Sequence, residues 1–198
     1  MSNIDGGITD DVRKREEEYF RRKDRELIER MRQAARDAQM REALEGRTGI
    51  HDEESLCQLE SLGFTLETCA LLPLIPLVQV AWAEAGVSAA ERKAIVSFAR
   101  ARGIEAESAA DQQLTSWLDH RPSEEMFHKA TRLIAAMVGH HAEAAVDLSI
   151  EDLIARCEAI AHASGGVFGF GGVSANERAV LKEIAAELSA ESQSSADD

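Results

Sequence analysis

The sequence predicts an all-α fold, in which a long N-terminal helix precedes a pseudo-repeated helical bundle. Apolar residues recur at helical spacing along most of the chain, and no stretch shows the sustained alternation with β-branched residues that is typical of strands. Only three prolines and 5% aromatic residues argue against a β-sandwich or barrel. A hydrophobic content of 44% excludes disorder across the whole chain.

The first predicted element is an unusually long helix over residues 10–45, which follows a flexible start at residues 1–9. Asp10 or Asp11 can cap it, and neither glycine nor proline interrupts the run to Glu45. About 35 residues at 1.5 Å each give a helix of about 50 Å. Its apolar side chains form one narrow seam that comprises Val12, Tyr19, Phe20, Leu27, Ile28, Met31, Ala34, Ala35 and Ala38.

The other positions of this helix are mostly charged, and four acid–base pairs are spaced to interact across one helical turn. These pairs are Glu17–Arg21, Glu18–Arg22, Glu26–Arg30 and Asp37–Arg41. Two interpretations remain open. The helix either lies solvated along its own domain, or it projects as an arm whose apolar seam fits a partner's groove.

Residues 46–189 are predicted to form an acidic domain of shorter helices, and residues 190–198 a disordered acidic tail. Glycines after apolar stretches predict helix ends at Gly63, Gly103 and Gly165. The expected helices lie near residues 52–62, 66–84, 89–102, 109–120, 124–141, 150–164 and 175–189.

Serines stand just before five of these helices, where a hydroxyl group can accept a hydrogen bond from a free backbone N–H. These serines are Ser88, Ser108, Ser123, Ser149 and Ser174. In the pairs Ser88/Glu91 and Ser174/Glu177 a glutamate follows three residues later, which completes a capping box.

The two capping boxes belong to an internal repeat. Residues 87–92 (VSAAER) recur as residues 173–178 (VSANER), and the apolar positions that follow stay in phase. Each copy follows an apolar helix and a glycine-containing turn. Two helix–turn–helix units packed face to face would bury both apolar stripes.

Charge is unevenly distributed along the chain, whose net charge is −14. Residues 10–45 hold 11 bases and 11 acids, whereas residues 46–198 hold 11 bases and 24 acids. This acidic balance excludes binding of the chain as a whole to nucleic acid through charge.

The apolar segments predict no membrane insertion. The longest apolar run, residues 69–83, has 15 residues and contains two prolines, and a membrane span needs about 20 apolar residues. The polar first 25 residues carry no secretory signal. An odd number of cysteines without a CxxC motif (Cys57, Cys69 and Cys157) is typical of buried thiols in a reducing compartment, so we expect a cytoplasmic protein.

Residues 78–92 (VQVAWAEAGVSAAER) resemble the repeated signature of the tellurite-resistance TerB-like family. That signature is a small-residue helix end, Asp-Gly, then Val-Ser and a glutamate that opens the next helix. Here Glu84-Ala85 replaces Asp-Gly, and the second copy has a glycine-rich run at residues 165–172 that holds no acid. The resemblance covers residues 50–190 and implies an all-helical stress-response domain whose molecular activity is poorly defined.

Glu84 and Glu91 are the candidate metal ligands of this segment. A Ca²⁺ site requires six or more oxygen ligands, and Glu91 is already explained by its capping box. We therefore expect no metal site and no cofactor. An alternative function, binding of a small ligand or metal ion by a tellurite- or stress-resistance domain, would be centred on these two glutamates.

Residues 15–28 (REEEYFRRKDRELI), after Gly6-Gly7, resemble the inhibitory segment of the mitochondrial F1-ATPase inhibitor family, over residues 6–31. The resemblance implies that an aromatic and arginine cluster anchors in a catalytic interface while charged neighbours pair around it. The family's histidine-rich stretch is missing, so no pH switch is carried over. The expected partner-binding residues are Glu17, Tyr19, Phe20, Arg21, Arg25, Glu26 and Leu27.

No catalytic constellation is found. Serines and cysteines have no adjacent predicted base, and the glycine-rich run lacks the strand and the Lys-Ser/Thr of a phosphate loop. His140-His141 stands at a predicted helix end, and His120 and His128 lie in different helices without a nearby cysteine, so no zinc site is expected. Phe168 and Phe170 are expected to pack into the bundle.

The sequence thus predicts a non-catalytic regulatory protein that binds a protein partner, with a rotary ATPase as one candidate. Tyr19, Phe20 and Leu27 would enter the partner's groove, and Arg21 and Arg25 would pair with acids of the partner. The oligomeric state is not predicted.

Overall fold

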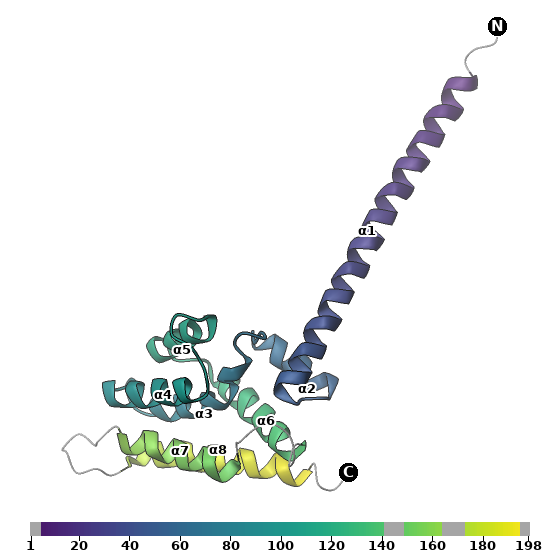
Figure 1. Cartoon of the computed structure of the whole chain (residues 1–198). Helices are drawn as coiled ribbons and strands as arrows, with labels where there is room; N and C mark the ends of the chain where they lie inside the picture. Colours follow the sequence, from purple (N-terminus) through teal and green to yellow (C-terminus); the bar gives the residue numbers. More distant parts are fainter. Residues whose placement is uncertain (1–4, 141–148, 164–172, 195–198) are drawn as a thin grey trace. The chain divides into compact units, whose positions relative to one another are not determined.

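The structure, a computed structural model, describes residues 5–140, 149–163 and 173–194 (Figure 1). All regular elements in this part are helices, which confirms the all-α fold. The chain divides into two compact units, residues 1–42 and 43–198. The elements are α1 (Asp5–Thr48), α2 (Glu53–Ser61), the 3-10 helix η1 (Cys69–Leu74), α3 (Ile75–Ala81), α4 (Ala89–Ala101), α5 (Ala109–Asp119), α6 (Glu124–His140), α7 (Ile150–Ala163) and α8 (Ala175–Ser194).

The described part of the first unit is helix α1 up to Glu42, and this helix starts at Asp5 and not at Asp10. Gly6 and Gly7 are helical, because adding a glycine to an already formed helix costs only about 1 kcal/mol relative to alanine. Residues 5–9 therefore belong to the helix and not to a flexible start.

Ion pairs across one turn of α1 replace tertiary packing as its stabilising contacts. Glu17 pairs with Arg21 (N···O 3.7 Å), as expected, and also with Arg13 (3.5 Å). Arg30 instead donates a hydrogen bond from Nε to the backbone carbonyl of Glu26 (3.4 Å). Exposed pairs of this kind contribute about 0.2–0.5 kcal/mol each, so the helix depends on their number.

The last turn of α1 belongs to the second unit. Leu44 is fully buried in its core, and the hydroxyl of Thr48 donates a hydrogen bond to the Leu44 carbonyl (2.7 Å). The helix passes through Gly46 and stops at Thr48, because Gly49 adopts a left-handed conformation (φ 71°). The helix therefore ends three residues after the predicted end at residue 45.

The predicted serine caps of the second unit are confirmed. The hydroxyl of Ser88 accepts a hydrogen bond from the backbone N–H of Glu91 (3.2 Å), and that of Ser174 accepts one from Glu177 (3.1 Å). The three other serines accept the corresponding bonds for α5, α6 and α7. Gly63 and Gly103 have positive φ angles as predicted, whereas Gly165 lies outside the described residues.

The single helix expected over residues 66–84 is wrong. The segment forms η1 and then the short helix α3, which ends at Ala81. Pro73 lies inside η1 and Pro76 in the first turn of α3. A proline lacks the backbone N–H and clashes with the preceding turn, so two of them prevent one continuous α-helix.

The expected start of the disordered tail at residue 190 is also wrong, because α8 continues to Ser194. Residues 190–194 hold Ala, Glu and Gln, which favour a helix that is already nucleated. Residues 195–198 lie outside the described part of the chain.

The two repeat copies correspond to α3–α4 and α7–α8, and they pack against each other. α7 contacts both α3 and α4, while α8 contacts α3, α7 and, most extensively, α6. Figure 1 shows α7 and α8 side by side next to α3 and α4. At equivalent positions of the two copies, Ile95 of α4 is fully buried and Leu181 of α8 is partly buried.

Two of the three cysteines are buried, as expected, but Cys57 in α2 is exposed. The expectation of three buried thiols is therefore wrong for this residue, which faces away from the buried Leu56 and Leu59 of the same helix.

Over the described ranges, no helix combines the length and the apolar character that crossing a membrane requires.

The capping boxes should measurably stabilise the second unit. We expect Ser88→Ala and Ser174→Ala each to lower the free energy of unfolding by about 1 kcal/mol, because each leaves helix N-terminal N–H groups without an acceptor. Urea denaturation of the full chain measures the change. Ser116→Ala, at an exposed position inside α5, is the control and should leave stability within about 0.5 kcal/mol. An equal loss in the control variant would contradict the role of the caps.

Candidate functional site

All seven predicted partner-binding residues lie on α1 in the first unit, and all are exposed. The side chains that would normally be buried are the most informative: Tyr19 is 48% exposed, Phe20 61% and Leu27 50%. The structure therefore presents these apolar groups to solvent, as a surface that binds a partner would require.

Tyr19 and Phe20 form an aromatic pair. Their ring centroids lie 5.8 Å apart at an interplanar angle of 76°, which is an edge-to-face contact. The guanidinium group of Arg22 and the ammonium group of Lys23 lie over the Tyr19 ring, 5.6 and 5.8 Å from its centroid. Positive charge thus borders the aromatic pair on its own helix.

The seven residues do not share one face of the helix. Successive residues of an α-helix are rotated by about 100°. Phe20 and Leu27 project from the helix in nearly the same direction. Arg21 and Arg25 project from another side, rotated by about 100–140° around the helix axis from Phe20. A groove that receives the apolar seam would meet these two arginines at its rim and not in its floor.

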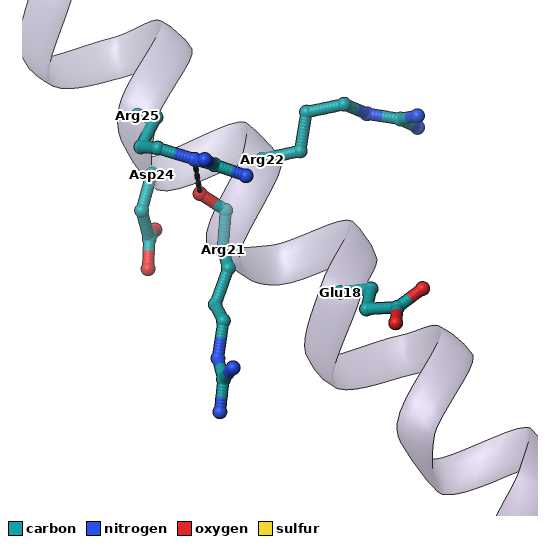
Figure 2. A pocket seen from close by; sticks show the side chains of 5 residues that line it. All are labelled: Glu18, Arg21, Arg22, Asp24 and Arg25. Carbon is teal, nitrogen blue, oxygen red and sulfur yellow. Dashed lines mark hydrogen bonds between the residues drawn. The ribbon is translucent and has the colours of Figure 1, made fainter.

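A shallow depression lies beside these arginines, and only side chains of α1 border it (Figure 2). Figure 2 shows Glu18, Arg21 and Arg22 extending away from the helix in different directions. Arg25 bends back and donates a hydrogen bond from Nε to the Arg21 carbonyl (3.2 Å). One helix cannot enclose a ligand, so this depression is not a closed binding site.

The acidic members of the set are held by neighbours on α1. Glu17 pairs with Arg13 and Arg21, and Glu26 pairs with Lys23 (3.1 Å). The hydrogen bond from Lys23 is the main reason that the pKa of Glu26 lies below its usual value. A partner's charges would therefore have to exchange with existing intrahelical pairs.

The weaker candidates, Glu84 and Glu91, lie in the second unit. Glu91 is buried, and its carboxylate accepts a hydrogen bond from the backbone N–H of Ser88 (2.7 Å). Burial raises the pKa of Glu91; the hydrogen bonds with Ser88 oppose this effect, and the negative charges of Glu177 and Glu84 add to it. Across the described ranges, these two glutamates do not join a third metal-ligating side chain.

The repeat brings the two capping glutamates close enough to interact. Glu177 is as buried as Glu91, and one of its carboxylate oxygens, Oε1, has no hydrogen-bond partner. The sequence showed each glutamate as a local cap but gave no sign of their proximity. The fold thus places two acids inside the bundle, where the negative charge of Glu177 disfavours the charged form of Glu91.

A different group of metal-ligating side chains was missed by the sequence analysis. His128 of α6 lies beside Glu183 and Glu187 of α8, and the ligand atoms of the three residues all lie within 4.8 Å of one another. His128 was considered only with other histidines and cysteines. The spacing of Glu183 and Glu187, one helical turn apart, was the available signal.

The remaining sequence candidates carry little chemistry. His120 is exposed at the end of α5, and burial raises the pKa of Cys157 to about 12, which disfavours a reactive thiolate. The side chain of His140 is not described. His141, the glycine-rich run at residues 165–172 and its two phenylalanines, Phe168 and Phe170, lie outside the described residues.

The buried pair of capping glutamates generates a pH prediction. We expect the Glu91 carboxyl to titrate above pH 4.5 and its pKa to fall in Glu177→Gln, which removes a neighbouring negative charge but keeps a cap acceptor. Because the folded form holds its proton more tightly, this group's contribution to stability is full below about pH 4.5 and is lost as pH rises through the folded pKa. NMR titration of the side-chain carboxyl measures both values.

Glu54→Gln, an exposed substitution in α2, serves as the control and should leave the Glu91 pKa unchanged. Titration of Glu91 at or below pH 4.5 would contradict the prediction.

The chain was compared with protein-family models, with curated proteins and with solved structures, and none of the three comparisons gave a match.

Proposed function

We propose that the chain is a non-catalytic protein-binding protein and that α1 is its binding element, docking as a helix into a groove of a partner. One observation carries this proposal. Among the side chains that the structure describes, the exposed large hydrophobic ones all lie on α1: Tyr19, Phe20, Leu27, Ile28, Met31 and Met40. Hydrophobic side chains gathered on one exposed element are typical of interaction sites.

The spacing of these side chains suits a groove. Phe20, Leu27 and Met31 follow one another at intervals of seven and four residues, which keeps them on one side of the helix. From Tyr19 to Met31 the seam is about 18 Å long. Aromatic residues are the commonest anchors of such interfaces, so Tyr19 and Phe20 would contribute most of the affinity.

The charged residues around the seam support selectivity. Arg21 and Arg25 stand where the rim of a groove would lie and would pair there with acids of the partner. Charges at the rim of an interface chiefly set the association rate and the choice of partner. The dense charge of residues 10–45 surrounds the exposed apolar seam with hydrated side chains of both signs.

The finer proposal is that the partner is an F1-type ATPase and that docking inhibits it. Its support is the resemblance of residues 15–28 to the inhibitory segment of that inhibitor family. In the second unit the TerB-like interpretation rests likewise on resemblance alone. A ligand-binding stress domain centred on Glu84 and Glu91 is the less favoured function, because the carboxylate of Glu91 serves as a helix cap.

Inhibition of ATP hydrolysis tests the finer proposal. We expect the full chain to inhibit an F1-type ATPase at micromolar concentration and Phe20→Ala to weaken inhibition by about 30-fold, which equals about 2 kcal/mol for a central anchor. Met40→Ala is the matched control, since Met40 is also exposed on α1 but lies outside the resembling segment. No inhibition at these concentrations would exclude this partner.

Site-specific crosslinking tests the broader proposal without assuming the partner. A photo-reactive side chain in place of Phe20 should crosslink one discrete protein, because this position faces the groove. The same group in place of Glu29, about 180° around the helix, should not. Equal products from both positions would contradict docking through the seam.

A further inference from the structure

α6 and α8 form the most extensive helix–helix contact in the described part of the second unit, and their shared edge carries a group of polar side chains. The imidazole Nδ1 of His128 lies 2.6 Å from Oε1 of Glu187. Glu183 stands one turn before Glu187 on α8, on the same side of the helix. Among the described residues, these side chains form the only group of three or more that could hold a metal ion.

Packing fixes the backbone positions that carry these side chains. Phe127 and Thr131 of α6 are fully buried, as are Ile184 and Leu188 of α8. Each polar residue is therefore adjacent to, or within a turn of, a buried neighbour that sets the rotation of its helix. Rotation of either helix that separated the three polar residues would also expose apolar surface.

The group is accessible from solvent. The side chain of His128 is 42% exposed and that of Glu187 25% exposed, while Glu183 is exposed. An ion can therefore enter without unfolding of the bundle, and the partial burial limits competition from water for its ligands.

We propose that His128, Glu183 and Glu187 form a binding site for a divalent transition-metal ion of the zinc type. One imidazole and two carboxylates are ligands that Zn²⁺ uses, and the two negative charges balance the charge of the ion. Ca²⁺ and Mg²⁺ prefer six or more oxygen ligands, so the imidazole selects against them. Three protein ligands leave a fourth tetrahedral position for water.

The required adjustment is small. Zinc ligands at about 2.0–2.2 Å from the ion lie about 3.3 Å apart in a tetrahedral site. The ion would take the place of the hydrogen between Nδ1 and Oε1. The distance between these two atoms would then increase by less than about 1 Å. The exposed side chain of Glu183 approaches by a change of rotamer.

Such an ion would join α6 to α8 between residues that are 59 positions apart in the chain. A ligand that binds only the folded state raises the free energy of unfolding, and this effect grows with the logarithm of its concentration once that exceeds Kd. The proposed site is therefore a structural cross-link between two helices of the second unit. It is independent of the docking function proposed for α1, because all three residues lie outside the first unit.

A zinc titration of the metal-free full chain tests the proposal. We expect one equivalent of Zn²⁺ to bind with micromolar or tighter affinity in competition with a chromogenic chelator, and the melting temperature to rise by several degrees. Glu183→Gln should weaken binding at least tenfold, and it leaves the His128–Glu187 hydrogen bond in place, so the fold is retained. His128→Ala should remove binding.

His51→Ala is the matched control, because His51 also pairs with a glutamate, Glu45, outside this group. This variant should bind Zn²⁺ like the unmodified chain. Equal zinc uptake by Glu183→Gln, His128→Ala and the unmodified chain would overturn the proposal. An equal rise in melting temperature with Ca²⁺ would also overturn it, since it would show an all-oxygen site.

Discussion

The second unit depends on one constraint: most of its helices are too short to be stable without their neighbours. They range from the 6 residues of η1 to the 20 residues of α8, and isolated helices shorter than about 12–15 residues are marginal in water. Stability must therefore come from the shared burial of apolar stripes, with the serine caps satisfying the helix starts. Because of this constraint the repeat copies pack on each other, and α6 and α8 are held tightly enough to bring His128 to Glu187.

α1 follows the opposite rule up to residue 42. It is 44 residues long, and its contacts in the first unit are mostly ion pairs between residues three or four positions apart. A helix stabilised in this way does not need to bury its apolar side, which leaves Phe20 and Met31 more than 60% exposed. The same sequence feature, a dense balance of acids and bases, therefore explains both the length of the helix and the availability of its seam.

Local signals predicted most of the fold. Capping serines and positive-φ glycines act within a few residues, so helix starts such as Ser88 and ends such as Gly63 could be predicted without knowledge of packing. The errors arose where two local preferences competed. At residues 66–84 apolar periodicity favoured one helix, and Pro73 with Pro76 imposed two. The tertiary interactions of Glu91 with Glu177 and of His128 with Glu187 could not be predicted, because the residues of each pair are far apart in sequence.

The two proposed activities draw on different kinds of surface. Docking through α1 relies on apolar side chains whose removal from water lowers the free energy, whereas ion binding at α6 and α8 relies on polar side chains whose backbone positions packing has already fixed. Mobile side chains would lose conformational entropy when they bind an ion. This cost is reduced where the buried Phe127 and Ile184 hold the backbone in place. For the same reason the imidazole and carboxylates at this edge form a better ion site than the exposed acids of α1, several of which already pair with bases of their own helix, although α1 carries far more charge.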